Sequence, residues 1–359
     1  MKLGDICNIL NGRNQKKVED INGKYPIYGS GGIMGYANDY ICKAGTTIIG
    51  RKGSINKPLY VDKDFWNVDT AFGLQPKECC NSRFLYYLCK SIDFTRYDKG
   101  VTIPSLVKSD LLQIPVSVPP LSEQYRIVEE LDQLSNIIEK KRQQLSELDN
   151  LAQSIFYDMF GDPVTNEKGW EVKKLENVVS KDCPISYGIV QPGENVIDGI
   201  PIVRPVDLTD TFVRLNELKK TNNEISNAYK RTILRGDELL ICVRGTTGLS
   251  ALATKDLKGC NVTRGIVPLF FDENNRWFIY LLLKQKSMLK IIRDLTYGIA
   301  LKQINIKELR ALPIPLPPLS LQQLFAQKIE AIEKEKELIK QSIKETEDLF
   351  NSRMDYYFG

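Results

Sequence analysis

The segments 114–162 and 312–359 each carry, after a proline pair, apolar residues spaced three and four positions apart. This spacing is a heptad pattern, in which one face of a helix packs against a partner helix. We expect the packing residues, called the seam below, to be Leu131, Leu134, Ile138 and Leu145 in the first segment and Ile329, Ile332, Ile339 and Ile343 in the second. The pattern therefore predicts two long amphipathic helices.

One lysine interrupts each seam, Lys141 in the first segment and Lys336 in the second. A helix of roughly 40 residues would be about 60 Å long. A single helix of that length with an apolar stripe would be unstable in water, because most helix stability in proteins comes from packing. We therefore expect the two helices to pack together. Two independent surface helices are the alternative.

The segments before the helices, 1–113 and 163–311, contain short apolar runs separated by glycine-rich turns. Runs of this kind, bounded by turn residues, are typical of buried strands. The strands are expected within 46–55 and 68–74, and within 238–248 and 262–271. The helices are expected over 82–91 and 277–293. Both segments therefore read as α/β (α+β) globular domains.

The second half of the chain repeats the first. The segment 114–122 matches 312–320 at an offset of 198 positions, and Gln124 matches Gln322 at the same offset. Lys2-Leu3 matches Lys174-Leu175 at an offset of only 172, so the second half carries 26 additional residues near its start. An internal duplication predicts two copies of one structural unit. The predicted organisation is a globular domain over 1–113, a helix within 114–162, a second globular domain over 163–311 and a second helix within 312–359.

The formal net charge of +4 hides an uneven distribution. Residues 1–113 carry 16 basic and 11 acidic side chains, and residues 163–311 carry 23 and 17. Residues 114–162 carry 4 and 9, and residues 312–359 carry 6 and 8. Basic domains on acidic helices are typical of a protein that contacts DNA phosphates in two places and not between them.

Each globular domain has a buried strand that leads into a glycine-rich turn with cationic and hydroxyl side chains. Such a turn can approach a DNA backbone or base edge closely, because glycine adds no side chain to block it. Arginine suits bidentate recognition of guanine, whereas lysine more often contacts phosphate. The leading candidate DNA contacts are Arg51, Lys52 and Ser54 in the first domain and Arg204, Arg244, Thr246 and Thr247 in the second.

Secondary candidates come from two other loops. Tyr28 and Ser30 lie in the glycine-rich segment 25–36 of the first domain. Ser105 precedes the first long helix, and Lys302 and Gln303 occupy the positions that match Pro104 and Ser105 in the second repeat. We expect both of these pre-helix loops to lie at the DNA-facing side of their domains.

Composition excludes several kinds of catalytic site. The chain has no histidine, which removes serine–histidine and cysteine–histidine nucleophilic sites. Its eight cysteines show no CxxC spacing, so we expect reduced, mostly buried thiols, no metal site and no cofactor. The first residues turn polar at once, and no apolar run reaches the length of a membrane span, so we expect a cytoplasmic protein.

Two other function classes stay open at this point. Asp207 with Glu217 imitates a metal-dependent nuclease pattern, although short matches of this kind are common by chance and the first repeat has no counterpart. The chain could also be a structural adaptor whose helices bind partners while its domains bind protein.

Several segments, in order and in duplicate, carry a resemblance to a known family. They are 25–36 (YPIYGSGGIMGY), 49–54 (IGRKGS), 103–106 (IPSL), both PPLS segments with a glutamine two residues on, and 160–163 (FGDP). With these features the sequence resembles the specificity subunits of Type I restriction-modification systems across essentially its full length. One departure is Leu321, which stands where the first repeat has Glu123.

The resemblance implies two target-recognition domains, related by a pseudo-twofold axis and joined by helices that form an antiparallel coiled coil. Each domain would read one half of a split site in double-stranded DNA with a fixed gap. The resemblance also implies that modification (methyltransferase) subunits, two of them, bind the helices and transfer the methyl group. Restriction subunits would then join through the complex, and this chain would supply no catalytic residue.

Overall fold

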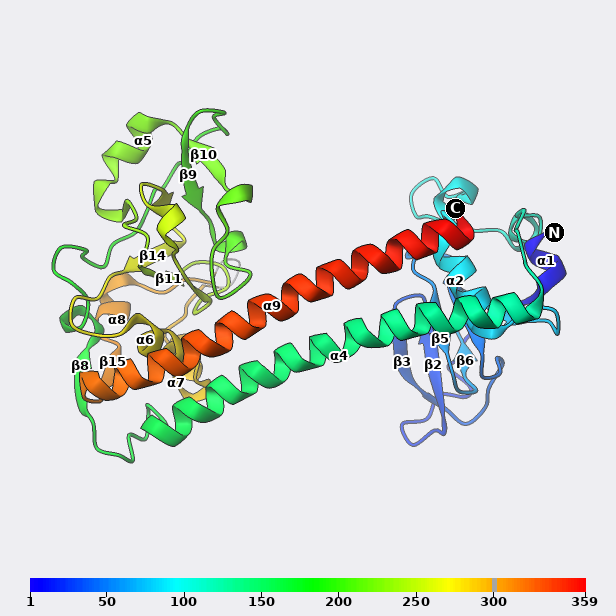
Figure 1. The fold of residues 1–359 in the computed structure, drawn as a ribbon, viewed down its shortest axis with the longest axis horizontal. Coiled ribbons are helices and arrows are strands. Elements are labelled where there is room, and N and C mark those ends of the chain that lie inside the picture. Colours follow the sequence, from blue (N-terminus) through cyan, green and yellow to red (C-terminus); the bar gives the residue numbers. More distant parts are fainter. Residues whose placement is uncertain (299–301) are drawn as a thin grey trace. The chain divides into compact units, whose positions relative to one another are not determined.

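The computed structural model describes residues 1–298 and 302–359 (Figure 1). The chain forms two compact units. Unit 1 comprises Met1–Gln143 together with Ile339–Gly359, and unit 2 comprises Gln144–Leu338. Two helices, α4 (Leu121–Phe160) and α9 (Leu319–Phe358), each contribute one end to each unit. The prediction of two long helices is therefore confirmed.

Unit 1 contains a four-stranded sheet in the order β1-β7-β4-β5 and a three-stranded sheet in the order β3-β2-β6. Its elements other than the long helices are α1 (Leu3–Ile6), β1 (Cys7–Asn11), β2 (Tyr25–Gly29), β3 (Gly32–Ala37), β4 (Thr46–Gly50), β5 (Leu59–Val61), β6 (Trp66–Asn67), β7 (Ala71–Pro76), α2 (Ser82–Ser91) and α3 (Lys108–Leu112). The helix over 82–91 matches the sequence-based prediction, and the Asn81 side chain caps its start.

Unit 2 contains three-stranded sheets in the orders β10-β9-β13 and β12-β11-β14 and a two-stranded sheet, β15-β8. Its elements are β8 (Glu171–Lys174), β9 (Ile200–Val203), β10 (Lys219–Thr221), α5 (Asn223–Ala228), β11 (Leu239–Cys242), β12 (Ser250–Leu252), β13 (Asn261–Val262), β14 (Ile266–Leu269), α6 (Arg276–Leu283), α7 (Lys286–Asp294), α8 (Ile306–Arg310) and β15 (Pro313–Leu316).

The sequence repeat is also a repeat of topology. In unit 1, β2 pairs antiparallel with β3 and parallel with β6. In unit 2, β9 pairs antiparallel with β10 and parallel with β13. The antiparallel pair β4–β7 likewise corresponds to β11–β14. Each domain therefore repeats one arrangement of strands around its glycine-rich turn.

The single helix expected over 277–293 is wrong, because the structure has two helices there. α6 ends at Leu283, and Gln285 adopts an extended backbone before α7 begins. The change of direction lets Met288 and Ile292 of α7 join the same buried core as α6. Tertiary packing overrides a helical sequence pattern at this point.

In unit 1 the ends of α4 and α9 run antiparallel (Figure 1). Glu130 pairs with Arg353 and Tyr357, whereas Lys141, further along α4, donates to Ser342 and Thr346, earlier in α9. The seam side chains of this end differ in burial. Leu131, Ile138 and Ile343 are buried, and Leu134 and Ile339 are half-buried.

In unit 2 the opposite ends of the same helices also run antiparallel. Ile329 and Ile332 are buried and Leu145 is half-buried. Lys336 is only 5% exposed, and its ammonium lies 2.7 Å from both Asp149 of α4 and Glu333 of α9. The lysine that interrupts the second seam is therefore neutralised by a carboxylate on each helix.

A buried glutamine in each repeat joins the start of a long helix to its globular domain. The Gln124 amide accepts from the backbone N–H of Asn81 and donates to the carbonyls of Cys79 and Pro119. Gln322 accepts from the N–H of Asn275 and donates to the Pro317 carbonyl. Because both side chains satisfy backbone groups just before a domain helix, the duplicated glutamine fixes where α2 and α6 begin.

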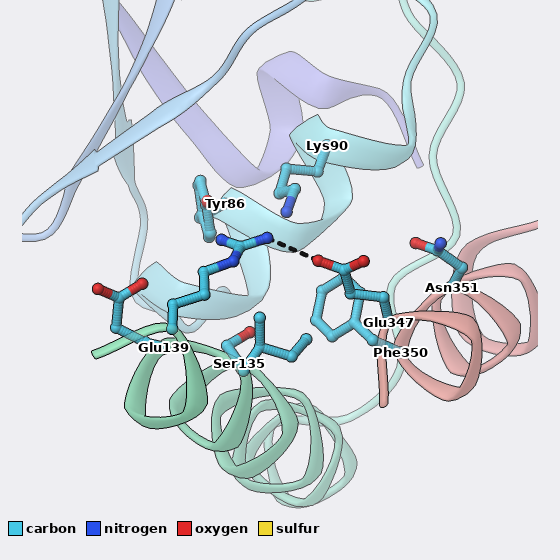
Figure 2. Close-up of a pocket in the computed structure, with 9 residues that line it drawn as sticks. Tyr86, Lys90, Ser135, Glu139, Glu347, Phe350 and Asn351 are labelled. Atoms are coloured by element: carbon cyan, nitrogen blue, oxygen red, sulfur yellow. Dashed lines mark hydrogen bonds and ion pairs between the residues drawn. The ribbon is translucent and has the colours of Figure 1, made fainter. Parts of the chain in front are cut away.

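Within unit 1, α2 lies over the paired helices and leaves a cavity of about 400 Å³ between them (Figure 2). Tyr86 and Lys90 of α2 line this cavity, together with the ion pair between Arg142 of α4 and Glu347 of α9. The ring of Tyr87, on the same helix, packs 6.0 Å from that of Phe350.

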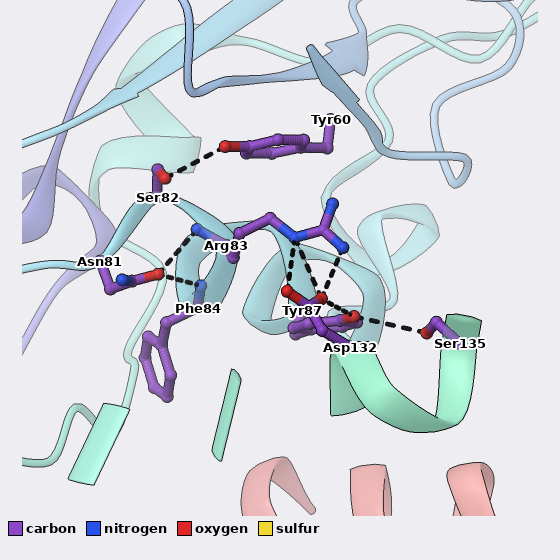
Figure 3. A network of polar contacts seen from close by, with 8 residues as sticks. All are labelled: Tyr60, Asn81, Ser82, Arg83, Phe84, Tyr87, Asp132 and Ser135. Carbon is purple, nitrogen blue, oxygen red and sulfur yellow. Dashed lines mark hydrogen bonds and ion pairs between the residues drawn. The ribbon is translucent and has the colours of Figure 1, made fainter. Parts of the chain in front are cut away.

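A polar network beside this cavity holds α2 against α4 (Figure 3). The Asp132 carboxylate accepts from the Arg83 guanidinium, with Nε–Oδ1 at 3.0 Å, and from the Tyr87 hydroxyl. Burial and the bond to Asp132 raise the pKa of Tyr87. In unit 2 the matching helix position, Glu330, accepts from the Trp277 indole at 3.0 Å. The same carboxylate position therefore anchors a domain helix in both repeats.

Replacing Lys336 with methionine should destabilise unit 2, because the nearly buried Glu333 carboxylate would lose its cation. We expect a loss of about 3–5 kcal/mol in the free energy of unfolding, measured by denaturant titration of the full chain. Lys334→Met, at an exposed position of the same helix, is the control and should change it little. Equal effects of the two substitutions would contradict this account of the cluster.

The stability difference between the wild type and Lys336→Met should also depend on pH. Burial lowers the pKa of Lys336, but its hydrogen bonds to Asp149 and Glu333 more than offset this, so the pKa lies above the ordinary 10.5. A raised pKa contributes stability that is fully present below the unfolded value and is lost as pH rises through the folded one. The difference between the wild type and Lys336→Met should therefore shrink above pH 10.5.

Candidate nucleic-acid interface

In unit 1, main-chain contacts join the basic turn after β4 to the loop before α3. The N–H of Gly53 donates to the carbonyl of Pro104 at 3.0 Å, and the N–H of Leu106 donates to the carbonyl of Arg51 at 2.9 Å. Lys52 forms a β-bridge with Ser105. The structure thus brings together two segments that were predicted as DNA contacts from separate parts of the chain.

The tip of the β2–β3 hairpin adds a third segment. A Cβ atom on Gly50 would lie 3.1 Å from Cβ of Ser30 and 2.3 Å from the carbonyl oxygen of Ser54. Glycine at this position therefore lets the hairpin tip and the basic turn approach each other. Gly53 has a φ of +78°, a left-handed conformation that favours glycine and closes the turn.

The side chains of the turn face solvent. Arg51, Lys52 and Ser54 are all exposed, and the Arg51 guanidinium lies 5.7 Å from the centre of the Phe72 ring. Tyr28 is different, because its ring packs edge-on against Phe65 at 5.4 Å and burial raises its pKa. The ring of Tyr28 thus supports the hairpin, while the cations and hydroxyls lie at its surface.

Unit 2 builds the same arrangement. The N–H of Gly245 donates to the carbonyl of Lys302 at 2.8 Å, and the N–H of Ile304 donates to the carbonyl of Val243 at 2.9 Å. Arg244 forms a β-bridge with Gln303. Lys302 is exposed and Gln303 is half-buried.

These bonds define which residues correspond. Gly245, with a φ of +93°, takes the place of Gly53, so Arg244 is the counterpart of Lys52 and Val243 that of Arg51. Arg51 and Arg244, both predicted as DNA contacts, therefore occupy successive and not equivalent positions of the turn. The guanidinium Nε of Arg244 is buried and has no hydrogen-bond partner among the described residues, so it remains an unpaired donor.

Arg204 lies at the end of β9, which corresponds to the hairpin strand β2 of unit 1. Its backbone N–H and guanidinium both bind the Asp207 carboxylate, with Nη2–Oδ1 at 2.8 Å. The adjacent Pro205 lies beside Gly265, whose added Cβ would fall 3.6 Å from the Arg244 carbonyl. Arg204 therefore sits next to the basic turn, but its guanidinium is already paired.

This ion pair also bears on the nuclease alternative. The Asp207 carboxylate accepts a hydrogen bond from the Arg204 guanidinium, and the side chain of Glu217 lies outside the described residues. Among the side chains that the structure describes, no three histidine, cysteine, aspartate or glutamate residues cluster in a way that could hold a metal ion. Of the two residues of the nuclease pattern, the structure therefore describes only the Asp207 side chain, which is paired with Arg204.

The two threonines of the second turn differ in their surroundings. The Thr247 hydroxyl lies 2.9 Å from that of Thr296, and Thr296 in turn donates to the carbonyl of Ile292 in α7. Thr246 is exposed. Thr246 is thus free to contact a ligand, whereas Thr247 ties the turn to α7.

Sequence reasoning missed one cation beside the second turn. Arg264 is exposed, and its guanidinium lies 5.8 Å from the centre of the Tyr187 ring, whose hydroxyl donates to the Ile304 carbonyl. The sequence predicts a strand within 262–271, which includes this arginine. The Arg264-Gly265 pair in that apolar run was the available sign of a break between β13 and β14.

The cysteines behave as the sequence suggested. All eight are free, and only Cys79 among them is exposed. Burial raises the pKa of Cys42 to about 12, so its thiol is not ionised at neutral pH. In the part of the chain that the structure describes, no helix has the length and apolar character needed to cross a membrane.

Comparison with known proteins identifies the family. The sequence model of the family described as Type I restriction modification DNA specificity domain matches residues 1–150 and 167–348. The chain belongs to this family. The family match spans both units, in agreement with the duplicated arrangement of turn and pre-helix loop.

Individual relatives within the family are distant in sequence. The chain is 23% identical over 375 residues to the Type I restriction enzyme EcoBI specificity subunit of Escherichia coli, covering 92% of this chain and 78% of that protein. The solved S subunit of a Type-I restriction-modification system from M. genitalium has a TM-score of 0.63 at 15% identity, covering 100% of this chain and 95% of that one. These likenesses show the fold.

A second solved structure concerns complex assembly and conformational transition of the type I R-M system. The chain matches it with a TM-score of 0.55 at 18% identity, over 99% of this chain and 96% of that one. This likeness again concerns the fold.

A matched pair of glycine substitutions tests the geometry of the first turn. Gly50→Ala should destabilise the protein by about 1–3 kcal/mol, because the new methyl group would overlap the Ser54 carbonyl and force the turn away from Ser30. Gly31→Ala is the control, since no atom lies within 4 Å of its added Cβ. Thermal unfolding of both variants measures the difference. A neutral Gly50→Ala would show that the hairpin and turn are not closely packed.

Proposed function

We propose that this chain is the DNA-recognition subunit of a Type I restriction-modification complex and reads a split site in double-stranded DNA with a fixed gap. One observation carries the proposal. Each repeat holds a basic, glycine-closed turn against its pre-helix loop by equivalent main-chain bonds, Gly53–Pro104 in one and Gly245–Lys302 in the other. A reading surface built twice is what a two-part site requires.

The chemistry of the turns fits recognition of duplex DNA. Exposed cations lie at the first turn, Arg51 and Lys52, and beside the second, Arg264 and Lys302. They can neutralise phosphates, which provides most of the sequence-independent affinity. Arg244, half-buried in the second turn, carries the guanidinium that a bidentate contact with a guanine edge requires. Lys52, at the equivalent place in the first domain, suits a phosphate contact. We assign the DNA contacts to the turn residues, to Ser30 at the hairpin tip, and to Ser105, Lys302 and Gln303 in the pre-helix loops.

The long helices are the proposed binding surface for two modification subunits, through which restriction subunits join. Several apolar side chains on their outer faces are exposed, among them Tyr125 and Tyr356 in unit 1 and Leu324 and Leu338 in unit 2. Methyl transfer would take place on the modification subunits. The role of this chain is then to hold those subunits at the two half-sites it reads.

The two-reader proposal predicts a modular response. Replacing 1–113 with the corresponding domain of another specificity subunit should change one half of the methylated motif and leave the other half and the gap intact. Modification-sensitive sequencing of host DNA measures both halves in one experiment. The unaltered second half is the internal control. An unsplit motif, or a change in both halves, would contradict the proposal.

The turn residues predict separable effects on binding by the assembled complex. Arg244→Ala should cost about 1–3 kcal/mol and relax base preference in one half-site, and Arg244→Lys should relax it as well, because lysine cannot make the bidentate contact. Arg51→Ala should also relax preference, but in the other half-site. Lys52→Ala should weaken all sequences alike and lower the slope of log affinity against log salt by about one.

Lys63→Ala is the control for Lys52→Ala. Lys63 is exposed and follows β5, whose Val61 pairs with Thr46 at the start of β4. The basic turn follows Gly50 at the end of β4, so Lys63 and the turn lie at opposite ends of this strand. Its removal should change neither affinity nor salt dependence. Unchanged binding curves for both arginine variants would show that the turns do not contact DNA.

A further inference from the structure

We propose that Val101 and Ile103, at the tip of the loop 98–105, contact thymine methyl groups in the half-site read by the first domain. The inference rests on the proposed function and adds to it an apolar element of base discrimination. Val101 has a relative exposure of 102% and Ile103 one of 60%. Two β-branched apolar side chains thus project into solvent beside the basic turn.

The loop is held in place at its base. The Asp98 carboxylate oxygen Oδ1 accepts from the N–H groups of both Gly100 and Ser105, each at 2.7 Å. The N–H of Lys99 donates to the carbonyl of Ser105 at 2.9 Å. A Cβ on Gly100 would lie only 1.9 Å from the Ile103 carbonyl oxygen, so the two sides of the loop approach closely. The tip is therefore presented by a closed, bonded loop.

The loop joins the candidate interface directly. Pro104 and Ser105, which follow the tip, are the residues bonded and bridged to Gly53 and Lys52. Three cations, Arg51, Lys52 and Lys99, are exposed around this junction. An apolar tip among cations is complementary to a polyanion that also carries apolar groups.

Duplex DNA has this combination. Its phosphates are anionic, and the thymine 5-methyl is the apolar group on a base edge in the major groove. Valine and isoleucine have no donor or acceptor and so cannot read a hydrogen-bonding pattern, but they can bury a methyl group. Burying one methyl contributes a factor of about four in affinity, so the two side chains together contribute roughly fifteenfold.

The exposed apolar residues of the neighbouring hairpin strengthen the case. Ile33 and Met34 of β3 are 56% and 62% exposed, and they follow the Ser30 tip that approaches the same turn. The cationic turn therefore has apolar side chains on both adjoining loops.

The test uses the complete chain assembled with its modification subunits, on duplexes that carry the site found from host methylation. Each thymine of the first half-site is replaced in turn by deoxyuridine, which lacks only the 5-methyl group. Val101→Ser and Ile103→Ser remove every methyl group of the side chain, so neither variant can bury a thymine methyl. Ile21→Ser is the matched control, because Ile21 is 91% exposed but precedes β2, at the end away from the hairpin tip.

With the wild type, deoxyuridine at one or two positions should lower affinity about fourfold each. With Val101→Ser or Ile103→Ser, thymine-containing DNA should bind about as weakly as deoxyuridine-containing DNA binds to the wild type. Deoxyuridine at the matching position should then cause no further loss of affinity. Ile21→Ser should behave as the wild type. Thermal unfolding of all three variants should be unchanged.

The inference would be overturned by a first half-site without any A·T pair, by wild-type binding that is insensitive to deoxyuridine, or by losses that simply add in the variants. These outcomes differ from failure of the proposed function. If the proposed function were wrong, the wild-type complex would show no preference for a split site, whatever the bases at the tested positions.

Discussion

The packing of α4 against α9 is the interaction on which the rest of the structure depends. Each helix gives one end to each unit, so neither core is complete without both. In unit 2, Phe156 and Phe160 of α4 each pack on both Phe278 of α6 and Phe325 of α9, with ring centres 4.8 to 5.7 Å apart. In unit 1, Phe358 packs on Phe84 of α2. Each domain helix is thereby fixed to a surface made by two distant segments.

Polar groups give this apolar packing its specificity. A purely apolar seam could slide by a heptad at little cost, whereas a lysine must keep its partners. Lys141 reaches hydroxyls in unit 1, and Lys336 reaches carboxylates in unit 2. The two lysines differ in partners and in position along the helices, so each end of the helix pair has its own polar contacts and only one register satisfies both. The buried Gln124 and Gln322 likewise fix the junction between each long helix and its domain, because their amides bind specific backbone groups there.

Sequence periodicity was enough to predict the long helices and the duplication, because both are patterns that recur over many residues. It also placed α2, whose start is marked by Asn81. It was insufficient where a single tertiary contact decides the outcome. The break before α7 follows from core packing, and the pairing of Arg204 with Asp207 and the stacking of Arg264 on Tyr187 depend on folded geometry. The correspondence of Lys52 with Arg244 appears only in the main-chain bonds of the turns.

Those main-chain bonds have an evolutionary consequence. The contacts that hold turn to loop run from Leu106 to Arg51 and from Ile304 to Val243 through backbone atoms alone. Side chains at the surface of this framework can therefore mutate without removing the bonds beneath them. On the proposed assignment of the DNA contacts, a lineage of such proteins can acquire new target sequences by a few substitutions at these turns while its architecture is inherited intact.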